Sequence, residues 1–247
     1  MPGESRTRIS RVRPDAVEVR GRDLAGELMG RLTFTEYFHL LLTGREPSED
    51  ERFFLDLLLV AIAEHGMMPT NVAARMTLAA DPGSLHGAVA AGILGAGPVV
   101  LGTSEECAKL LVSDREPAAI VRELHAAGGR VPGFGHPIHS PVDPRAERIL
   151  ELAGARGVSG RHVERARALG EAVTEVVGRR LPMNVAMPIA AVMLDLGFPA
   201  EVVKAVPILA RTAGLLAHLA EEREDPVGFV LGHAAEAAVE YEPPPEP

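Results

Sequence analysis

Val131-Pro132-Gly133-Phe134-Gly135-His136-Pro137, followed at a short distance by Asp143-Pro144-Arg145-Ala146, is the most informative stretch of this chain. Glycine has no Cβ, so a backbone that contains it can come close to a ligand. His136 can exchange a proton near neutral pH, and Arg145 offers a planar guanidinium that binds a carboxylate through two hydrogen bonds. A glycine-rich turn that presents an imidazole, with an arginine on the next helix, indicates a site for a small carboxylate.

The composition is that of a globular helical protein. The chain has 247 residues, of which 47% are hydrophobic, 24% charged and only 4% aromatic. This length is sufficient for a well-packed core. Abundant Ala and Leu with few aromatics favour helices over sheets. The formal net charge of −9 argues against a nucleic-acid partner, because phosphate binding needs an excess of Lys and Arg.

Nothing in the sequence points to export or to a membrane. Cys107 is the only cysteine, so an intramolecular disulfide is impossible and an oxidising compartment is not indicated. The N-terminus carries arginines without the apolar stretch of a secretory signal. No run approaches the ~18 apolar residues of a membrane-spanning helix. We therefore expect a cytoplasmic protein.

Hydrophobic periodicity predicts an all-α fold. The first 20 or so residues favour an extended arm or a short strand pair, and the Pro-rich acidic tail from Tyr241 is expected to be disordered. Ser48 and Glu51 form a capping-box pattern, and Gly44 is a typical helix stop. The predicted helices cover residues 32–42, 49–65, 70–80, 84–97, 103–112, 114–127, 143–154, 161–180, 184–196 and 200–223.

The helix at 84–97 is rich in Gly and Ala. Small residues at helical spacing let two helix backbones approach closely, so this helix is predicted to be buried and to contribute to a homodimer contact. Either Thr70 or Asn71 is expected to cap the helix before it, and Ser84 to cap this one.

Several polar residues have settings that suggest a function, although each also has a structural explanation. His86 follows the Ser84 cap, where free N–H groups favour an anion. His65 ends a long apolar helix and could be either a C-terminal cap or a ligand-binding residue. Arg211 lies in an apolar helix, where it needs a salt bridge or a bound anion. His139 could be structural or functional. Since no pair has HxxxH or CxxC spacing, no metal site is predicted.

Five separated motifs resemble the citrate synthase superfamily, which includes the citryl-CoA lyases. The resemblance covers about residues 20–223 and keeps the family's order and spacing. The motifs are Arg20-Gly21 through LTFTEYFHLLLTGREP, Ala63-Glu64-His65, Ser84-Leu85-His86-Gly87, VPGFGH with DPRA, and RTAGLLAH.

The resemblance implies an acyl-CoA site between two helical domains. The large domain would comprise residues 1–101 and 206–247, with the small domain at 102–205 inserted. His86 would stabilise the enol of a CoA thioester, and His136 would polarise or protonate the ketone-derived oxygen. Carboxylates would be held by His65, Arg145 and Arg211, and the CoA thioester by Val131, Gly133 and Gly135.

One position departs from the family pattern. Where the family has an aspartate as general base, this chain has Ala186, in Asn184-Val185-Ala186. It lies 25 residues before Arg211, the spacing of the family aspartate, and Asp195 is too far along the helix to replace it. HAAEAAVEY also lacks the arginine that full-length synthases usually contribute across the dimer.

Two hypotheses therefore stay open. The first is an enzyme that makes or breaks a carbon–carbon bond next to a thioester (acetyl-CoA plus oxaloacetate, or citryl-CoA). The second is a non-catalytic paralogue that binds CoA or carboxylates as a regulatory or partner subunit.

Overall fold

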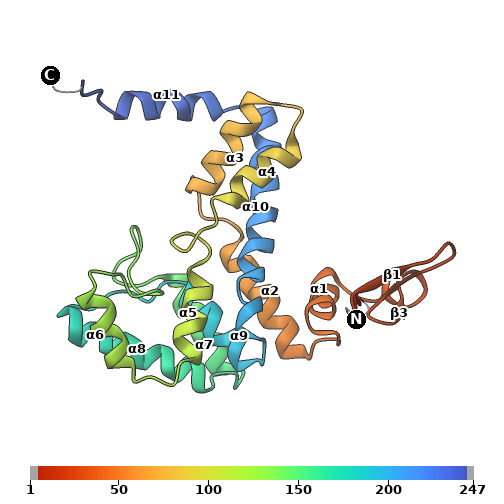
Figure 1. Cartoon of the computed structure of the whole chain (residues 1–247), viewed down its shortest axis with the longest axis horizontal. Helices are drawn as coiled ribbons and strands as arrows, with labels where there is room; N and C mark the ends of the chain where they lie inside the picture. The colour runs from red at the N-terminus through yellow and green to blue at the C-terminus, as the bar shows by residue number, and fades with distance from the viewer. Residues whose placement is uncertain (1–4, 244–247) are drawn as a thin grey trace.

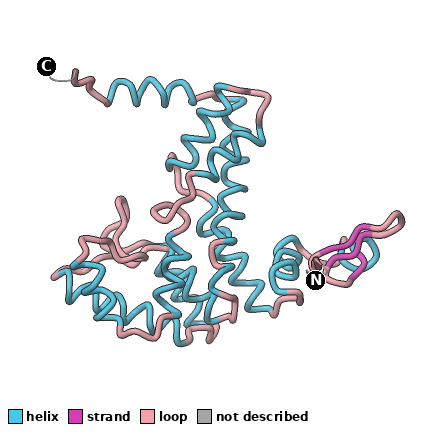
Figure 2. The backbone as a smooth tube through the Cα atoms, viewed as in Figure 1, coloured by secondary structure: helices cyan, strands magenta, loops and turns pink. Residues whose placement is uncertain are grey.

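The computed structural model describes residues 5–243, which form helices apart from a small N-terminal sheet (Figures 1 and 2). Strands β1 (Ser10–Val12), β2 (Val17–Val19) and β3 (Arg22–Asp23) are antiparallel, in that order. The sequence predicted an extended arm or a strand pair here, and the structure has one short strand more. The all-α prediction is confirmed.

The first helices begin where their capping residues predict. A short π-helix (Leu24–Leu28) leads to α1 (Phe34–Thr43) and α2 (Glu49–Ala63). Ser48 and Glu51 form the predicted capping box, and Gly44 ends α1 with a φ of 84°. Satisfying free N–H groups in this way stabilises a helix start by about 1 kcal/mol.

Helices α3 (Pro69–Ala80) and α4 (Leu85–Leu94) pack against each other and differ from the prediction in three respects. Neither Thr70 nor Asn71 caps α3, because Pro69 occupies the first helical position and both residues are buried in the first turn. Ser84 stands at the N-cap of α4 without a side-chain capping bond. The prediction that α4 is buried is wrong for the single chain: Ala88 and Gly92 are its only buried residues.

The next five helices form one group with α9 at its centre. They are α5 (Thr103–Val112), α6 (Pro117–Ala126), α7 (Pro144–Ala155), α8 (Arg161–Val177) and α9 (Ala186–Asp195). Helices α5, α7 and α8 contact α9, and α6 lies on α8. Every residue of α9 from 187 to 194 is buried, as expected for a helix that is apolar on all sides.

The predicted helix at 200–223 is divided into a 3₁₀ turn (Ala200–Val202) and α10 (Ala205–Glu224). Pro207 explains the break, because it lacks the N–H that a continuous helix would need there. An additional helix, α11 (Gly228–Ala238), extends away from the body at the C-terminal end (Figure 1).

Helix α10 runs along α2, α3 and α4. Gly214 makes close contact possible, since a Cβ there would lie 2.2 Å from the carbonyl oxygen of Ala63. By length and composition, residues 200–224 could cross a membrane. The contacts of α10 with three other helices are instead those of a core helix.

Two of the three apolar cores among the described residues organise the helices from α2 to α10. Helices α3, α4 and α10 share a smaller core, whereas α5–α9 share a larger one to which α2 contributes Phe54, Leu55 and Leu58. The larger core thus joins α2 to the segment 102–205. The assignment of that segment as a separate small domain stays a prediction.

Candidate active site

The glycine-rich loop is fixed by backbone hydrogen bonds to the segment before α9. The N–H of Gly135 donates to Pro182 O at 2.8 Å, and the N–H of Asn184 donates to Gly133 O at 2.9 Å. Both glycines have a φ that L side chains rarely adopt, 85° and 86°. This pairing places His136 beside the start of α9.

Two backbone donors determine the tautomer of His136. The N–H groups of Ile138 and His139 point to its Nδ1 at 3.1 and 2.9 Å. Because Nδ1 accepts both hydrogen bonds, it carries no proton, and the proton of the neutral ring is on Nε2. His136 is therefore a hydrogen-bond donor at Nε2.

His65 faces this donor from the turn between α2 and α3. The two Nε2 atoms are 3.3 Å apart, so His65 accepts with its Nε2 and keeps its proton on Nδ1. The turn is fixed by Glu64, which accepts from the N–H groups of His65 (2.8 Å) and Gly66 (2.6 Å). Asn71 supports it by donating to Gly66 O at 2.6 Å.

His139, which the sequence left undecided, completes a cluster of three imidazoles. Its ring centroid lies 4.4 Å from that of His136 and 5.4 Å from that of His65. One nitrogen from each ring lies within 4.8 Å of the others, a spacing that could hold a metal ion. However, a metal ligand needs a free lone pair. The unprotonated Nδ1 of His136 already accepts from two N–H donors, and its Nε2 carries the proton. The donor set therefore fits a metal ion poorly.

The environment favours neutral imidazoles. Burial lowers the pKa of His65, and the positive charge of Arg145 lowers it further. Burial likewise lowers the pKa of His136, with a contribution from His139. Both rings are therefore neutral at pH 7, a state suited to hydrogen bonding with a polar substrate.

Asp143 holds Arg145 and the start of α9 together. Its buried carboxylate accepts from Nε of Arg145 at 3.0 Å, from Nη2 at 2.9 Å and from the N–H of Val185 at 3.0 Å. Burial raises the pKa of Asp143, but its bonds with Arg145 outweigh this and leave the pKa below its ordinary value. Asp143 thus fixes the Nε–Nη2 edge of the Arg145 guanidinium, and Nη1 is left for a ligand.

Arg211 is buried, and no carboxylate among residues 5–243 forms an ion pair with it. Only 2% of its surface is exposed, and its hydrogen bonds go to Asn71 Oδ1 and Ile62 O, both at 3.3 Å. Its Nε has no partner at all among the described residues. Burial lowers the pKa of Arg211, Glu64 opposes this shift, and Arg145 adds to it.

Arg75 shows what a structural buried arginine looks like in this protein. It is also almost fully buried, but it binds Glu222 at 2.9 Å, together with Glu221 and His218. Since a buried charge is normally paired, the unpaired state of Arg211 indicates a site for an anionic ligand.

Ala186 is adjacent to these groups. It is the first residue of α9 and is half-buried. Its neighbour Val185 binds Asp143, and Asn184 donates through Nδ2 to Gly135 O at 3.0 Å. Position 186 therefore borders the loop that carries His136.

His86 does not join the cluster. Asn71, in the first turn of α3, contacts the His65 turn, whereas His86 starts α4 after the chain has turned back from the far end of α3. Twelve helical residues span about 18 Å. His86 is exposed and makes no hydrogen bond, ion pair or ring contact with a described residue. Its catalytic role stays a prediction that this arrangement does not support.

The residues assigned to CoA also differ in position. Val131 and Gly133 are buried, whereas Gly135 is half-exposed. The N–H and the carbonyl oxygen of Gly135 are hydrogen-bonded to Pro182 and Asn184, and the CoA assignments stay predictions.

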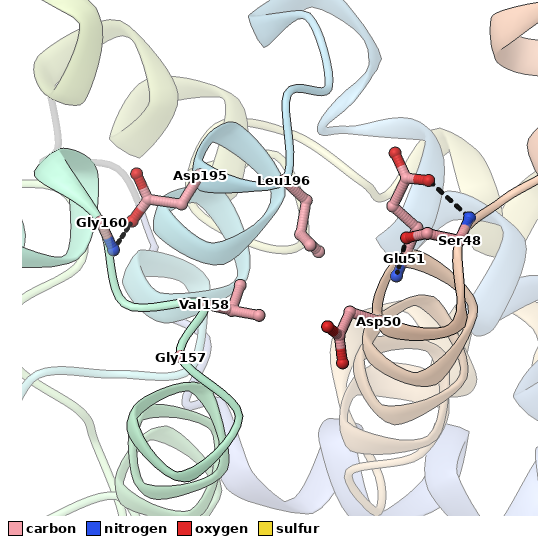
Figure 3. A pocket seen from close by; sticks show the side chains of 8 residues that line it. All are labelled: Ser48, Asp50, Glu51, Gly157, Val158, Gly160, Asp195 and Leu196. Atoms are coloured by element: carbon pink, nitrogen blue, oxygen red, sulfur yellow. Dashed lines mark hydrogen bonds between the residues drawn. The ribbon is translucent and has the colours of Figure 1, made fainter.

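Two cavities lie outside the histidine cluster. One, of about 530 Å³, separates the start of α2 from the turn before α8 (Figure 3). Its carboxylates are already engaged: Asp195 accepts from the N–H groups of Gly160 and Val163 at 2.8 and 3.0 Å. This confirms that Asp195 does not replace the missing base. The second cavity, of about 750 Å³, lies between α7, α8 and Phe134.

Sequence reasoning missed the supporting residues. Asp143 positions Arg145, Glu64 fixes the turn of His65, and Asn71 accepts a hydrogen bond from Arg211. Asp143 could have been found from its place two residues before Arg145. The contribution of Asn71 depends on the angle between α3 and α10, for which the sequence has no signal.

Comparison with known proteins identifies the family. Residues 9–228 match the model of the citrate synthase C-terminal domain. Citryl-CoA lyase from Hydrogenobacter thermophilus has a similar structure, with a TM-score of 0.86 and 30% identity over 98% of this chain and 96% of that one. Citrate synthase from Synechocystis sp. is 32% identical over 201 residues, which are 78% of this chain and 50% of that protein.

ATP citrate lyase from Methanothrix soehngenii, in complex with citrate and coenzyme A, has the same fold. It is 23% identical with a TM-score of 0.81, over 100% of this chain and 43% of that one. The chain spans about half the length of the curated citrate synthases that it matches, 51%, 58% and 50% for three of them. With a family model that covers most of its length, the chain belongs to the citrate synthase superfamily.

Proposed function

We propose that this protein cleaves or forms the carbon–carbon bond next to a CoA thioester, with citryl-CoA on one side of the reaction and acetyl-CoA plus oxaloacetate on the other. The observation that carries the proposal is Arg211, a buried guanidinium without a carboxylate partner. The likeness to a citryl-CoA lyase over 96% of that chain supports it.

The residues have complementary tasks in this reaction. Arg145 and Arg211 hold substrate carboxylates, because a guanidinium binds them in a defined orientation. His136 donates from Nε2 to the oxygen that is a hydroxyl in citryl-CoA and a carbonyl in oxaloacetate. Such a preoriented donor stabilises the negative charge that develops on this oxygen.

A second candidate is a non-catalytic subunit that binds citrate or CoA. Ala186 is the observation that favours it, because a methyl group cannot transfer a proton. Loss of a positioned general base typically lowers the rate by ~10²–10⁴-fold. The intact carboxylate-binding groups are compatible with both candidates.

The deciding experiment is an assay of the purified protein in both directions. With citryl-CoA we expect oxaloacetate to appear without free thiol, and with acetyl-CoA plus oxaloacetate we expect slow formation of citryl-CoA. Release of thiol would indicate a synthase that also hydrolyses the thioester. Calorimetry with citrate or CoA serves as control: binding without turnover would establish the non-catalytic candidate.

We further propose that the protein is a cytoplasmic homodimer that associates through α4 and its neighbours. Leu94 on α4 is 86% exposed, and Phe229 on α11 is 68% exposed. Both helices pack against α3, and apolar side chains that are exposed in this way are typical of a protein interface. Light scattering at micromolar concentration should give twice the mass of 26.2 kDa. Leu94→Glu should shift the protein towards the monomer, and a wild type of monomeric mass would contradict the proposal.

A further inference from the structure

The proposed reaction needs a proton carrier that the groups assigned so far do not supply. Cleavage of citryl-CoA removes a proton from the hydroxyl oxygen and adds one to the methylene carbon. His136 cannot accept the first, because its Nδ1 is engaged by two N–H donors and its Nε2 already carries a proton. Ala186 cannot donate the second.

The carboxylates near the cluster are committed elsewhere. Asp143 is buried and accepts four hydrogen bonds, three from Arg145 and one from Val185. Glu64 accepts from the N–H groups that fix the His65 turn and contacts His218 at 3.0 Å. The free nitrogen of His65 accepts from His136.

His139 is the remaining titratable group. Among the described residues, no hydrogen bond or ion pair to its side chain is formed, although its backbone N–H donates to His136. Its ring stands 4.4 Å from that of His136, tilted by 34°. A substrate oxygen that accepts from Nε2 of His136 therefore lies within reach of His139.

We propose that His139 is a catalytic acid–base residue that moves the proton in place of the missing aspartate. This inference rests on the proposed function. In cleavage, neutral His139 takes the hydroxyl proton. The O–H electron pair becomes the second bond of the carbonyl, and the carbon–carbon bond breaks, leaving its pair on the thioester enolate. His139 then returns the proton to the enolate carbon, which becomes the methyl group of acetyl-CoA.

Atoms, electrons and charge balance without another reactant. A purely structural role would not explain why residue 139 is a histidine, because its backbone N–H, not its side chain, orients His136. Any residue other than proline could provide that N–H.

The test compares His139→Gln with wild type. Glutamine keeps the backbone N–H and polarity but cannot carry a proton. Oxaloacetate release from citryl-CoA should fall about 100-fold, as is typical for loss of an acid–base group. Citrate binding by calorimetry should change little. His125→Gln, at an exposed histidine on α6, is the matched control and should keep full turnover.

Two further variants separate proton transfer from structure. Added imidazole should restore turnover to His139→Gly, and Ala186→Asp should restore it to His139→Gln, because each supplies a new proton carrier. Wild-type turnover that survives His139→Gln, or a loss that neither treatment restores, overturns this inference and leaves the proposed function standing. A wild type without turnover overturns both.

Discussion

Replacing Arg211 with methionine should weaken citrate binding strongly without unfolding the protein. Arg211 is 2% exposed and forms no ion pair with a carboxylate of the described residues, so the free protein bears the cost of a buried charge that the more distant Glu64 compensates only in part. Exchanging such a charge for an apolar group of similar volume is often neutral or stabilising. The same charge is what attracts a carboxylate, and losing a buried charged hydrogen bond weakens binding by about 2–5 kcal/mol.

The measurements are calorimetry with citrate and thermal unfolding. We expect affinity to fall about 100- to 1,000-fold, with a melting temperature equal to or above that of wild type. Arg75→Met is the matched control: it breaks a buried pair with Glu222 and should destabilise the fold by about 3–5 kcal/mol. A similar destabilisation by Arg211→Met would identify Arg211 as structural and remove the main support for an anion site.

In the His139→Gln background, Ala186→Asp should increase turnover by about 10²–10⁴-fold, the usual contribution of a positioned acid–base group. Position 186 is the first residue of α9 and borders the His136 loop through the bonds of Asn184 and Val185. A carboxylate there would also interact favourably with the helix N-terminus. By thermodynamic balance, cleavage and condensation should gain by the same factor.

The assay follows oxaloacetate with citryl-CoA, and citryl-CoA with acetyl-CoA plus oxaloacetate. Ala186→Asn is the control, because it matches the size of aspartate but cannot carry the proton. If neither wild type nor Ala186→Asp turns over while citrate still binds, the protein is better explained as a binding subunit. Equal gains for Asp and Asn in the His139→Gln background would show that size or polarity, not proton transfer, limits turnover.

Local features were the best predicted from the sequence. The capping box at Ser48 and the stop at Gly44 involve neighbours in the chain, so sequence spacing determines them. The same holds for Arg145, which is bound by Asp143 two residues before it. These elements depend on contacts within a few residues.

Features that depend on the packing of distant elements were missed or misplaced. His86 matched a short family motif, but the length and direction of α3 carry it away from the His65 turn. The role of His139 was left open, because its ring lies next to that of His65, which is 74 residues away in the sequence. Helix α11 has an exposed apolar side and no strong periodic pattern, so it did not stand out from the tail.

The fit of Gly133 has a consequence for how this family member can vary. A Cβ at 133 would lie 2.7 Å from Cε of Met187 and 2.9 Å from Sγ of Cys107. Three segments far apart in the sequence thus share one small volume, and none of the three positions can enlarge on its own. A bulkier residue at Cys107 on α5 or at Met187 on α9 would push the loop outwards and move His136 away from His65. The volumes of the buried side chains of Met187 and Cys107 therefore constrain the orientation of the His136 ring, in addition to its hydrogen bonds.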